Sequence, residues 1–200
     1  MQKTTFALKE WQVAVQALEQ GETILLLRKG GIRETEGKFS VQHETVLLYP
    51  TYEHQQPELL KPNYAAQVQP VESGWHPNEV RIGSWAKITE IIQITQPDAI
   101  ARLLPFHIWN LNCITERLKW KPNQPVHGLL LRTYKLPEPQ IIPYIESYGG
   151  CKSWIELEAA IALADCHPAL SEAEYQQQVE MIHAGLVDSV FKEVTLKPQI

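Results

Sequence analysis

Cysteine, aspartate and long apolar runs are all scarce in this sequence. The three cysteines form no Cys-x-x-Cys pair, which argues against a structural zinc site or a disulfide framework and favours a reducing compartment. No apolar run approaches the roughly 18 residues that a membrane-spanning helix needs. The start of the chain has no apolar segment typical of a secretory signal. We therefore expect a cytoplasmic protein with no membrane partner.

Aspartate makes up only three of the 23 acidic residues. Metal-dependent nucleases of the restriction type place a Pro-Asp upstream of an acid-x-Lys, so that two acids hold the metal beside the attacked phosphate. Pro97-Asp98 and Glu36-Gly-Lys38 are both present here, but in the reverse order. The seven histidines also show no His-x-x-x-His spacing. The sequence therefore predicts no metal site and no cofactor.

The chain is acidic overall, but its charge is unevenly distributed. Its 18 Lys and Arg against 23 Asp and Glu give a net charge of −5 and a pI near 5.8, which excludes a uniformly basic nucleic-acid protein. Residues 101–154 hold seven basic and three acidic residues, a net of +4, with three of the six tryptophans, whereas residues 155–200 have a net of −6. A basic segment with tryptophans suits phosphate contact and base stacking. The alternative is that its lysines are solvated and its tryptophans lie in the core.

The patterns of apolar residues predict an α+β fold. An apolar share of 44% supports a globular core, and we expect a single domain over residues 1–200. Stretches with helical spacing alternate with short apolar or period-two stretches that predict a mainly antiparallel sheet with flanking helices. The expected elements are a helix over 6–20 that stops at Gly21, strands over 23–28, 38–49, 85–94 and 127–136, an irregular loop over 55–74, and helices over 98–104 and 107–119.

The last part of the chain is expected to be helical. Ser153 with Glu156 and Ser171 with Glu174 both have the Ser-x-x-Glu spacing of a capping box, which marks a helix start. Prolines that follow residue 136 are expected to end the preceding strand. The expected division is a strand-rich region over 21–150 and a helical region over 153–190.

The densest polar cluster directly follows an apolar strand. Tyr52-Glu53-His54-Gln55 offers hydrogen-bond donors, acceptors and an aromatic ring at a strand exit, which suits a binding site. A hydrogen-bonded corner that turns the chain explains the same residues equally well, so both interpretations stay open. If the strands over 23–28 and 38–49 pair as a hairpin across a turn at 29–32, Arg28 and Tyr52 lie toward opposite ends of it.

Cys151 stands in Tyr148-Gly-Gly-Cys-Lys-Ser-Trp154, just before a predicted helix. A helix dipole at that position could lower the pKa of a thiol and make it reactive. The alternative is that the two glycines form a tight turn, that Cys151 is a small buried residue and that Trp154 packs in the core. The sequence favours this second interpretation.

Five segments together resemble a known family. They are Arg28-Lys-Gly-Gly-Ile32, Pro50-Thr-Tyr-Glu-His-Gln55, the stretch from His107-Ile-Trp109 to Trp120-Lys-Pro122, Leu129-Leu-Leu-Arg132 with Tyr134, and Gly149-Gly-Cys-Lys-Ser-Trp154. Over about residues 7–188 the chain is similar to an uncharacterised bacterial family, domain of unknown function 1802 (DUF1802). The resemblance implies no established activity. Because some members are joined to an Mrr-like restriction endonuclease domain, it implies a role beside DNA restriction, with a separate nuclease protein as partner.

The order of the predicted elements is also similar to that of PUA-like domains, small β-barrels that bind RNA or flip out modified bases. A strand over 85–94, a helix, an Ile-Trp segment and a strand over 127–135 carry this likeness. Such proteins hold an extruded base by aromatic stacking and by hydrogen bonds to its edge. The likeness implies a PUA-like barrel with a pocket for a base.

The leading hypothesis is a non-catalytic nucleic-acid-binding or sensing module with DNA or RNA as its partner. One alternative is a small-molecule enzyme that uses His54, Glu53 and Cys151 for acid–base or thiol chemistry. Another is a protein-interaction module formed by the acidic C-terminal region. The expected phosphate contacts are Arg28, Lys29, Arg117, Lys119, Arg132 and Lys135, the expected pocket residues are Tyr52, Glu53, His54, Gln55 and Trp109, and the further binding candidates are Tyr134, Cys151 and Trp154. Convergence of Arg28, His54, Arg132 and Trp154 on one pocket is the structural test.

Overall fold

The structure, a computed structural model, describes residues 2–29, 41–94, 96–120, 124–186 and 192–193. No helix in these ranges is long and apolar enough to cross a membrane. The elements are β1 (Lys3–Trp11), α1 (Gln12–Glu19), β2 (Leu25–Arg28), β3 (Thr45–Thr51), η2 (Pro57–Leu59), α2 (Pro62–Ala65), β4 (Glu79–Ile94), α3 (Pro97–Arg102), η3 (Leu104–Phe106), α4 (Leu111–Lys119), β5 (Val126–Pro143), η4 (Glu146–Tyr148), β6 (Trp154–Ala162), β7 (His167–Pro168), α5 (Glu172–Leu186) and β8 (Lys192–Glu193), where η marks a 3-10 turn.

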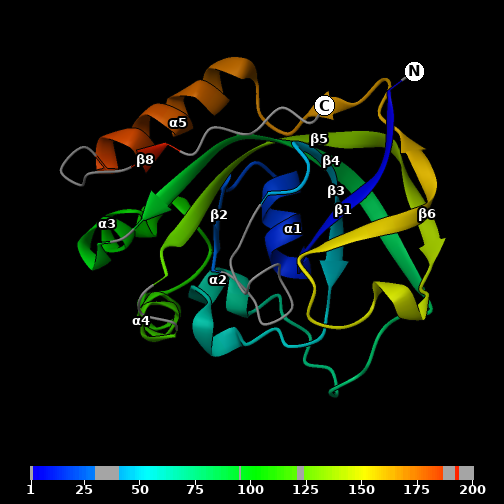
Figure 1. The fold of residues 1–200 in the computed structure, drawn as a ribbon, viewed down its shortest axis with the longest axis horizontal. Helices are drawn as coiled ribbons and strands as arrows, with labels where there is room; N and C mark the ends of the chain where they lie inside the picture. The colour runs from blue at the N-terminus through cyan, green and yellow to red at the C-terminus, as the bar shows by residue number, and fades with distance from the viewer. Residues whose placement is uncertain (1, 30–40, 95, 121–123, 187–191, 194–200) are drawn as a thin grey trace.

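One curved sheet organises the fold and bends around α1 (Figure 1). Its strand order is β2-β5-β4-β3-β1-β6, with β7 paired to β5 and β8 to β4. The pairing of β1 with β3 is parallel, and the other pairings between described strands are antiparallel. The prediction of an α+β fold with a mainly antiparallel sheet and flanking helices is confirmed. The described path is open, with β2 and β6 at its two ends.

The helix predicted over residues 6–20 is wrong in its first half. Residues up to Trp11 form β1, and only α1 after it is helical. The four residues from Ala7 to Glu10 are all buried, because β1 lies between β3 and β6 and has little contact with solvent. This burial removes the alternation that identifies a half-exposed strand. Gly21, with φ of 73°, ends the helix as predicted.

The hairpin considered for the second and third predicted strands does not form. β2 pairs with β5, with Leu25 opposite Leu130, and β3 lies between β1 and β4. The turn predicted at 29–32 falls largely in residues 30–40, which lie outside the described residues, as does the start of the predicted strand over 38–49. Both strands are buried and apolar along most of their length, so their sequences do not specify a partner.

Two further predictions about strands are wrong. β5 does not end at residue 136 but continues through its prolines to Pro143, paired with a β4 that begins at Glu79. The helix expected from Ser153 is a strand, β6, in which Ile155 and Leu157 are buried while the glutamates between and after them are exposed. This period-two burial pattern outweighs the capping-box spacing of Ser153. The predicted helical region over 153–190 therefore begins with a strand.

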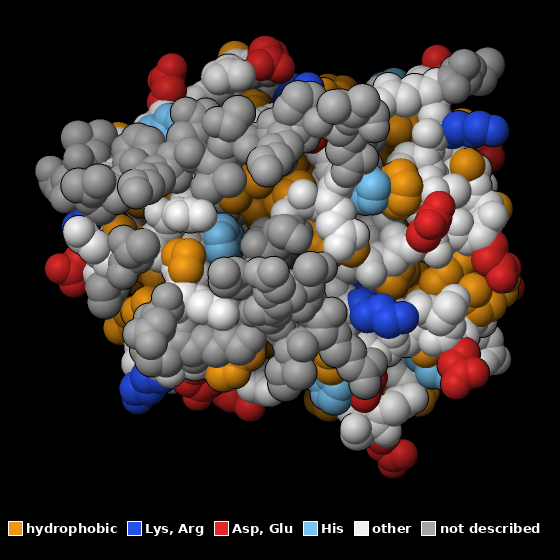
Figure 2. Space-filling view, viewed as in Figure 1, with side chains coloured by type: hydrophobic (Ala, Val, Ile, Leu, Met, Phe, Trp, Pro, Cys, Tyr) orange, Lys and Arg blue, Asp and Glu red, His pale blue; other side chains and the backbone are white. Residues whose placement is uncertain are grey.

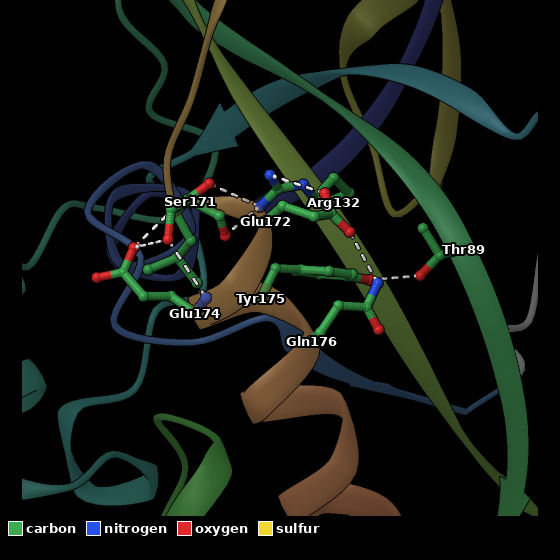
Figure 3. A network of polar contacts seen from close by, with 8 residues as sticks. Thr89, Arg132, Ser171, Glu172, Glu174, Tyr175 and Gln176 are labelled. Carbon is green, nitrogen blue, oxygen red and sulfur yellow. Dashed lines mark hydrogen bonds and ion pairs between the residues drawn. The ribbon is translucent and has the colours of Figure 1, made fainter.

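The second predicted capping box is confirmed at the start of α5. Glu174 Oε2 accepts a hydrogen bond from the Ser171 backbone N–H at 2.8 Å, and the Glu174 N–H donates to Ser171 Oγ at 3.3 Å. Arg132 on β5 fixes the same helix start by donating to the Leu170 carbonyl at 2.7 Å, and Tyr175 is hydrogen-bonded to Thr89 on β4 at 2.5 Å (Figure 3). α5 is thus part of the packed fold.

Truncating a buried side chain of α5 should measure this packing. Ile182 is fully buried in the main core, so Ile182→Ala is expected to lower the free energy of unfolding by about 2–5 kcal/mol. Met181 lies on the same helix but is exposed, so Met181→Ala should change it by no more than about 0.5 kcal/mol. Urea unfolding of the two variants compares them. Equal effects would mean that α5 is not packed as described.

The buried His107 makes stability depend on pH. Burial, together with the charges of Lys61 and Arg117, lowers the pKa of His107 from 6.5 to about 3. The folded protein therefore keeps this ring neutral while the unfolded chain takes up a proton below pH 6.5. The resulting contribution to stability is complete above pH 6.5 and is lost as the pH falls toward 3, with a loss on the order of 2 kcal/mol by pH 5.

Urea unfolding at pH 7 and pH 5 checks this expectation. His107→Leu should reduce the difference in unfolding free energy between the two pH values, because the variant has no ring to protonate in the unfolded state. His167→Gln, which alters an exposed histidine, should keep the wild-type difference. An unchanged pH dependence in His107→Leu would contradict the assignment.

Candidate functional site

A cavity of about 560 Å³ lies where the ends of several strands meet. Its walls come from the junction of β1 with α1, the ends of β2 and β3, the loops over 52–54 and 74–77, and the segment over 144–153. Arg117 of α4 also lines it. The volume falls within the range of roughly 300–1,000 Å³ that is typical of small-molecule sites. This cavity is the candidate functional site.

The floor of the cavity holds a buried ion pair. Glu10 is only 5% exposed, and its Oε2 lies 3.2 Å from Arg28 Nη1. Arg28 Nη2 also donates to the Lys9 carbonyl at 2.8 Å. A buried carboxylate needs such a partner because its desolvation is costly. The end of β2 is thereby joined to the end of β1, although these strands are not neighbours in the sheet.

Lys9 adds a third charge to the floor and is itself buried. Its ammonium donates to the carbonyls of Tyr148 at 2.5 Å and Gly150 at 2.8 Å, and this holds the segment that carries Cys151 against the cavity. Burial lowers the pKa of Lys9; Cys151 opposes the shift, Lys152 adds to it and Glu53 opposes it. These groups from three segments are thus close enough to act on one another.

Aromatic side chains form much of the cavity wall. Tyr52 meets Trp75 edge to face, with ring centroids 5.9 Å apart, and His76 stacks on Tyr144 at 3.5 Å. Trp75 remains 45% exposed, so its ring is available to a ligand. Aromatic walls of this kind suit a flat ligand that can stack on them.

Glu53 positions the loop that carries Trp75. Its Oε1 accepts a hydrogen bond from the Gly74 N–H at 2.6 Å and lies 3.1 Å from Nε2 of His54. Gly74 has φ of 82° and His54 has φ of 64°, so both stand in the left-handed region that a tight turn requires. The two loops over 52–54 and 74–77 are therefore held together by one carboxylate.

The structure brings part of the predicted site together. Six predicted residues line the cavity: Arg28, Tyr52, Glu53, His54, Arg117 and Cys151. Gln55 instead accepts a hydrogen bond from the Val13 N–H at 3.2 Å, at the start of α1. For Gln55 the interpretation as a hydrogen-bonded corner is therefore the better one, whereas its three predecessors line the cavity.

Four other predicted residues lie away from the cavity. The expectation that Trp109 lines a pocket is wrong, because its side chain is fully buried in the core. Trp154 packs against that core, and Tyr134 stacks on Trp85 with centroids 4.3 Å apart. Arg132 contacts α5. Of the four residues whose convergence was the test, only Arg28 and His54 share the cavity.

Most of the predicted phosphate contacts are used inside the protein. Lys29 donates to the Arg117 carbonyl at 2.7 Å, and the Arg117 guanidinium in turn donates to the Leu27 carbonyl and lies over the Trp109 ring. Lys119 and Lys135 are exposed. On the face seen in Figure 2, Lys and Arg side chains are scattered and form no single patch. The net charge of +4 over residues 101–154 therefore does not produce a single basic patch on this face.

Several cavity residues were not predicted from the sequence. They come from segments without a recognisable motif: Lys9, Glu10, Trp75, His76, Tyr144 and Lys152. One signal in the sequence was a pair of adjacent charged residues, Lys9 and Glu10, inside an otherwise apolar stretch. Charged side chains are seldom buried without a partner, so this pair indicates a polar site within the fold. In the part of the chain that is described, no three His, Cys, Asp or Glu side chains are grouped so as to hold a metal ion.

Comparisons with known proteins place the chain in a family. A crystal structure of a mutant ZmASCH protein from Zymomonas mobilis is similar, with 12% identity and a TM-score of 0.41 over 88% of this chain and 93% of that one; a likeness of this strength supports no inference about activity. No curated protein is significantly similar in sequence. The family model described as "Domain of unknown function (DUF1802)" matches residues 7–181. The chain therefore belongs to the DUF1802 family, as its motifs predict.

Proposed function

We propose that this protein is a non-catalytic nucleic-acid-binding module that holds one base in the aromatic cavity. The observation that carries the proposal is the convergence of Tyr52, Trp75 and Tyr144 with Arg28 in a cavity large enough for a nucleotide. Proteins that bind single strands combine base–aromatic stacking with a basic groove along the backbone, and extruded bases are also held by stacking. The cavity offers both rings and polar groups for this purpose.

The charges that line the cavity support an anionic ligand. Four cationic side chains, Lys9, Arg28, Arg117 and Lys152, line it together with two acidic ones, Glu10 and Glu53. Lys152 is exposed, so it is available to a phosphate outside the aromatic walls. An excess of positive charge around aromatic walls matches a nucleotide, which joins a flat base to a phosphate.

The biological role and the cellular location of the protein do not follow from the cavity. A role beside DNA restriction, with a separate nuclease protein as partner, rests on the family resemblance alone and stays a prediction. A cytoplasmic location likewise stays a prediction, which the free state of all three cysteines fits.

Binding to single-stranded DNA and RNA of mixed sequence tests the proposal. We expect binding that weakens between about 50 mM and 200 mM salt, because phosphate contacts release counterions. Trp75→Ala should weaken it by about 1–3 kcal/mol, the usual effect of removing one stacking ring. Trp120→Ala is the matched control, because Trp120 is also exposed but does not line the cavity. Absence of binding at low salt, or an equal loss in both variants, would refute the proposal.

A second candidate is the thiol enzyme considered from the sequence. Glu53, His54 and Cys151 do line the same cavity, with Glu53 and His54 in contact and Cys151 exposed. If the module is non-catalytic, Cys151 should be alkylated by iodoacetamide at neutral pH no faster than free cysteine, and His54→Asn should leave that rate unchanged. Mass spectrometry of the modified peptide measures it. Much faster alkylation that depends on His54 would favour the enzyme.

A further inference from the structure

The cavity floor contains one cation that is not paired with a carboxylate. Lys9 lines the cavity and is only 8% exposed. Whereas Arg28 is paired with Glu10, none of the ion pairs between described residues includes Lys9. Its ammonium has three N–H donors, and two of them are used by the neutral carbonyls of Tyr148 and Gly150. A buried charge without a counter-charge is costly, so this position favours an anionic ligand.

The surroundings of the Lys9 ammonium include exposed residues of the cavity. Both carbonyls that it contacts belong to residues that line the cavity. Burial is the largest cause of the lowered pKa of Lys9, followed by the charges of Cys151, Lys152 and Glu53. All three of these residues line the cavity, and Cys151 and Lys152 are exposed. Lys152 also takes part in no ion pair between described residues. This end of the cavity therefore has two ammonium groups and the single carboxylate of Glu53.

Burial around Lys9 differs sharply from exposure at the aromatic wall. Tyr49, which lies opposite Lys9 in the sheet register, and Tyr148 are 3% and 4% exposed. Trp75 and His76 are exposed on the same cavity. A ligand that uses both features thus places an anionic group at the buried end and a flat ring toward the opening. The backbone of an extruded internal nucleotide would lie the other way round, at the opening.

We propose that the cavity binds a nucleotide by a terminal phosphate held at Lys9 and Lys152, with its base on the rings near the opening. An internal phosphodiester continues the chain on both sides, and buried residues beside Lys9 leave no path for the second side. A terminal phosphate monoester has one link only and carries a charge of about −1.5 to −2 at pH 7, which suits two ammonium groups. The inference rests on the proposed function and adds to it the chemical class of the nucleotide.

Strands that differ only at their ends test this inference. Short single strands of thymidine with two hydroxyl ends, with a 5′-phosphate or with a 3′-phosphate are compared by titration calorimetry at low salt. We expect one of the phosphorylated strands to bind about 10-fold more tightly than the unphosphorylated strand, because charged hydrogen bonds are added. If neither does, the inference is refuted.

A methyl ester on the same terminal phosphate tests the requirement for a monoester without altering the protein. The ester removes one charge and adds the second link that a phosphodiester has. The methylated strand should therefore bind within about 2-fold of the unphosphorylated one. Binding as tight as that of the free phosphate would overturn the requirement for a terminal group.

A pair of methionine variants supplies the protein side of the test. Lys9→Met removes the charge but keeps a long side chain, and should reduce the advantage of the phosphorylated strand to about 2-fold. Lys29→Met is the matched control, because the Lys29 ammonium also donates to two backbone carbonyls but does not line the cavity. This control should keep the advantage, and an equal loss in both variants would contradict the role of Lys9. If Lys9→Met does not fold, the methylated strand decides the outcome.

The outcomes separate this inference from the proposed function. If strands with and without a terminal phosphate bind equally and Trp75→Ala weakens both, the phosphate site is refuted while base binding stands. Thymidine monophosphates, with thymidine as their control, distinguish a free nucleotide from a strand end. If a monophosphate binds and no strand does, the phosphate site stands and nucleic-acid binding is refuted. If nothing binds at low salt, both proposals fail.

Discussion

The ion pair between Arg28 and Glu10 joins parts of the sheet that backbone pairing leaves apart. β2 lies at one end of the strand order and β1 near the other, yet the Arg28 guanidinium contacts both the Glu10 side chain and the Lys9 carbonyl. A buried pair of this kind is not by itself a large source of stability, but loss of one partner leaves an uncompensated charge. The same contact therefore links the two sides of the curved sheet and forms the polar floor of the cavity.

Much of the fold could be predicted from local patterns, and the failures share one cause. The strand before Arg28, the long strand that ends at Ile94 and the capped helix at Ser171 follow spacing rules that hold within one segment. The N-terminal strand and the pairing of β2 could not be predicted, because burial from several sides erases alternation and uniform apolar strands do not name a partner. Both depend on contacts between distant segments.

The candidate site was predictable to the extent that its residues stand in motifs. Tyr52, Glu53 and His54 formed a visible cluster, and Cys151 stood between glycines and a tryptophan. The rings supplied by Trp75 and Tyr144 come from loops without a local signal, and only the fold places them beside Tyr52. Segment charge was a poor guide, because cations such as Arg102 and Arg132 bind backbone carbonyls at the ends of other elements. These are contacts between distant segments, so the net charge of a sequence segment does not predict them.

The prolines in the last part of β5 affect whether a second molecule can pair with the edge of this strand. Beyond Lys135, no described strand other than β4 pairs with β5, so its outer margin offers backbone groups to any extended chain nearby. Proline has no N–H to donate, and Pro137, Pro139 and Pro143 interrupt that margin at short intervals. An incoming strand finds too few donors there to form a ladder. The prolines from which the sequence predicted the end of a strand thus protect the edge of this strand against edge-to-edge aggregation.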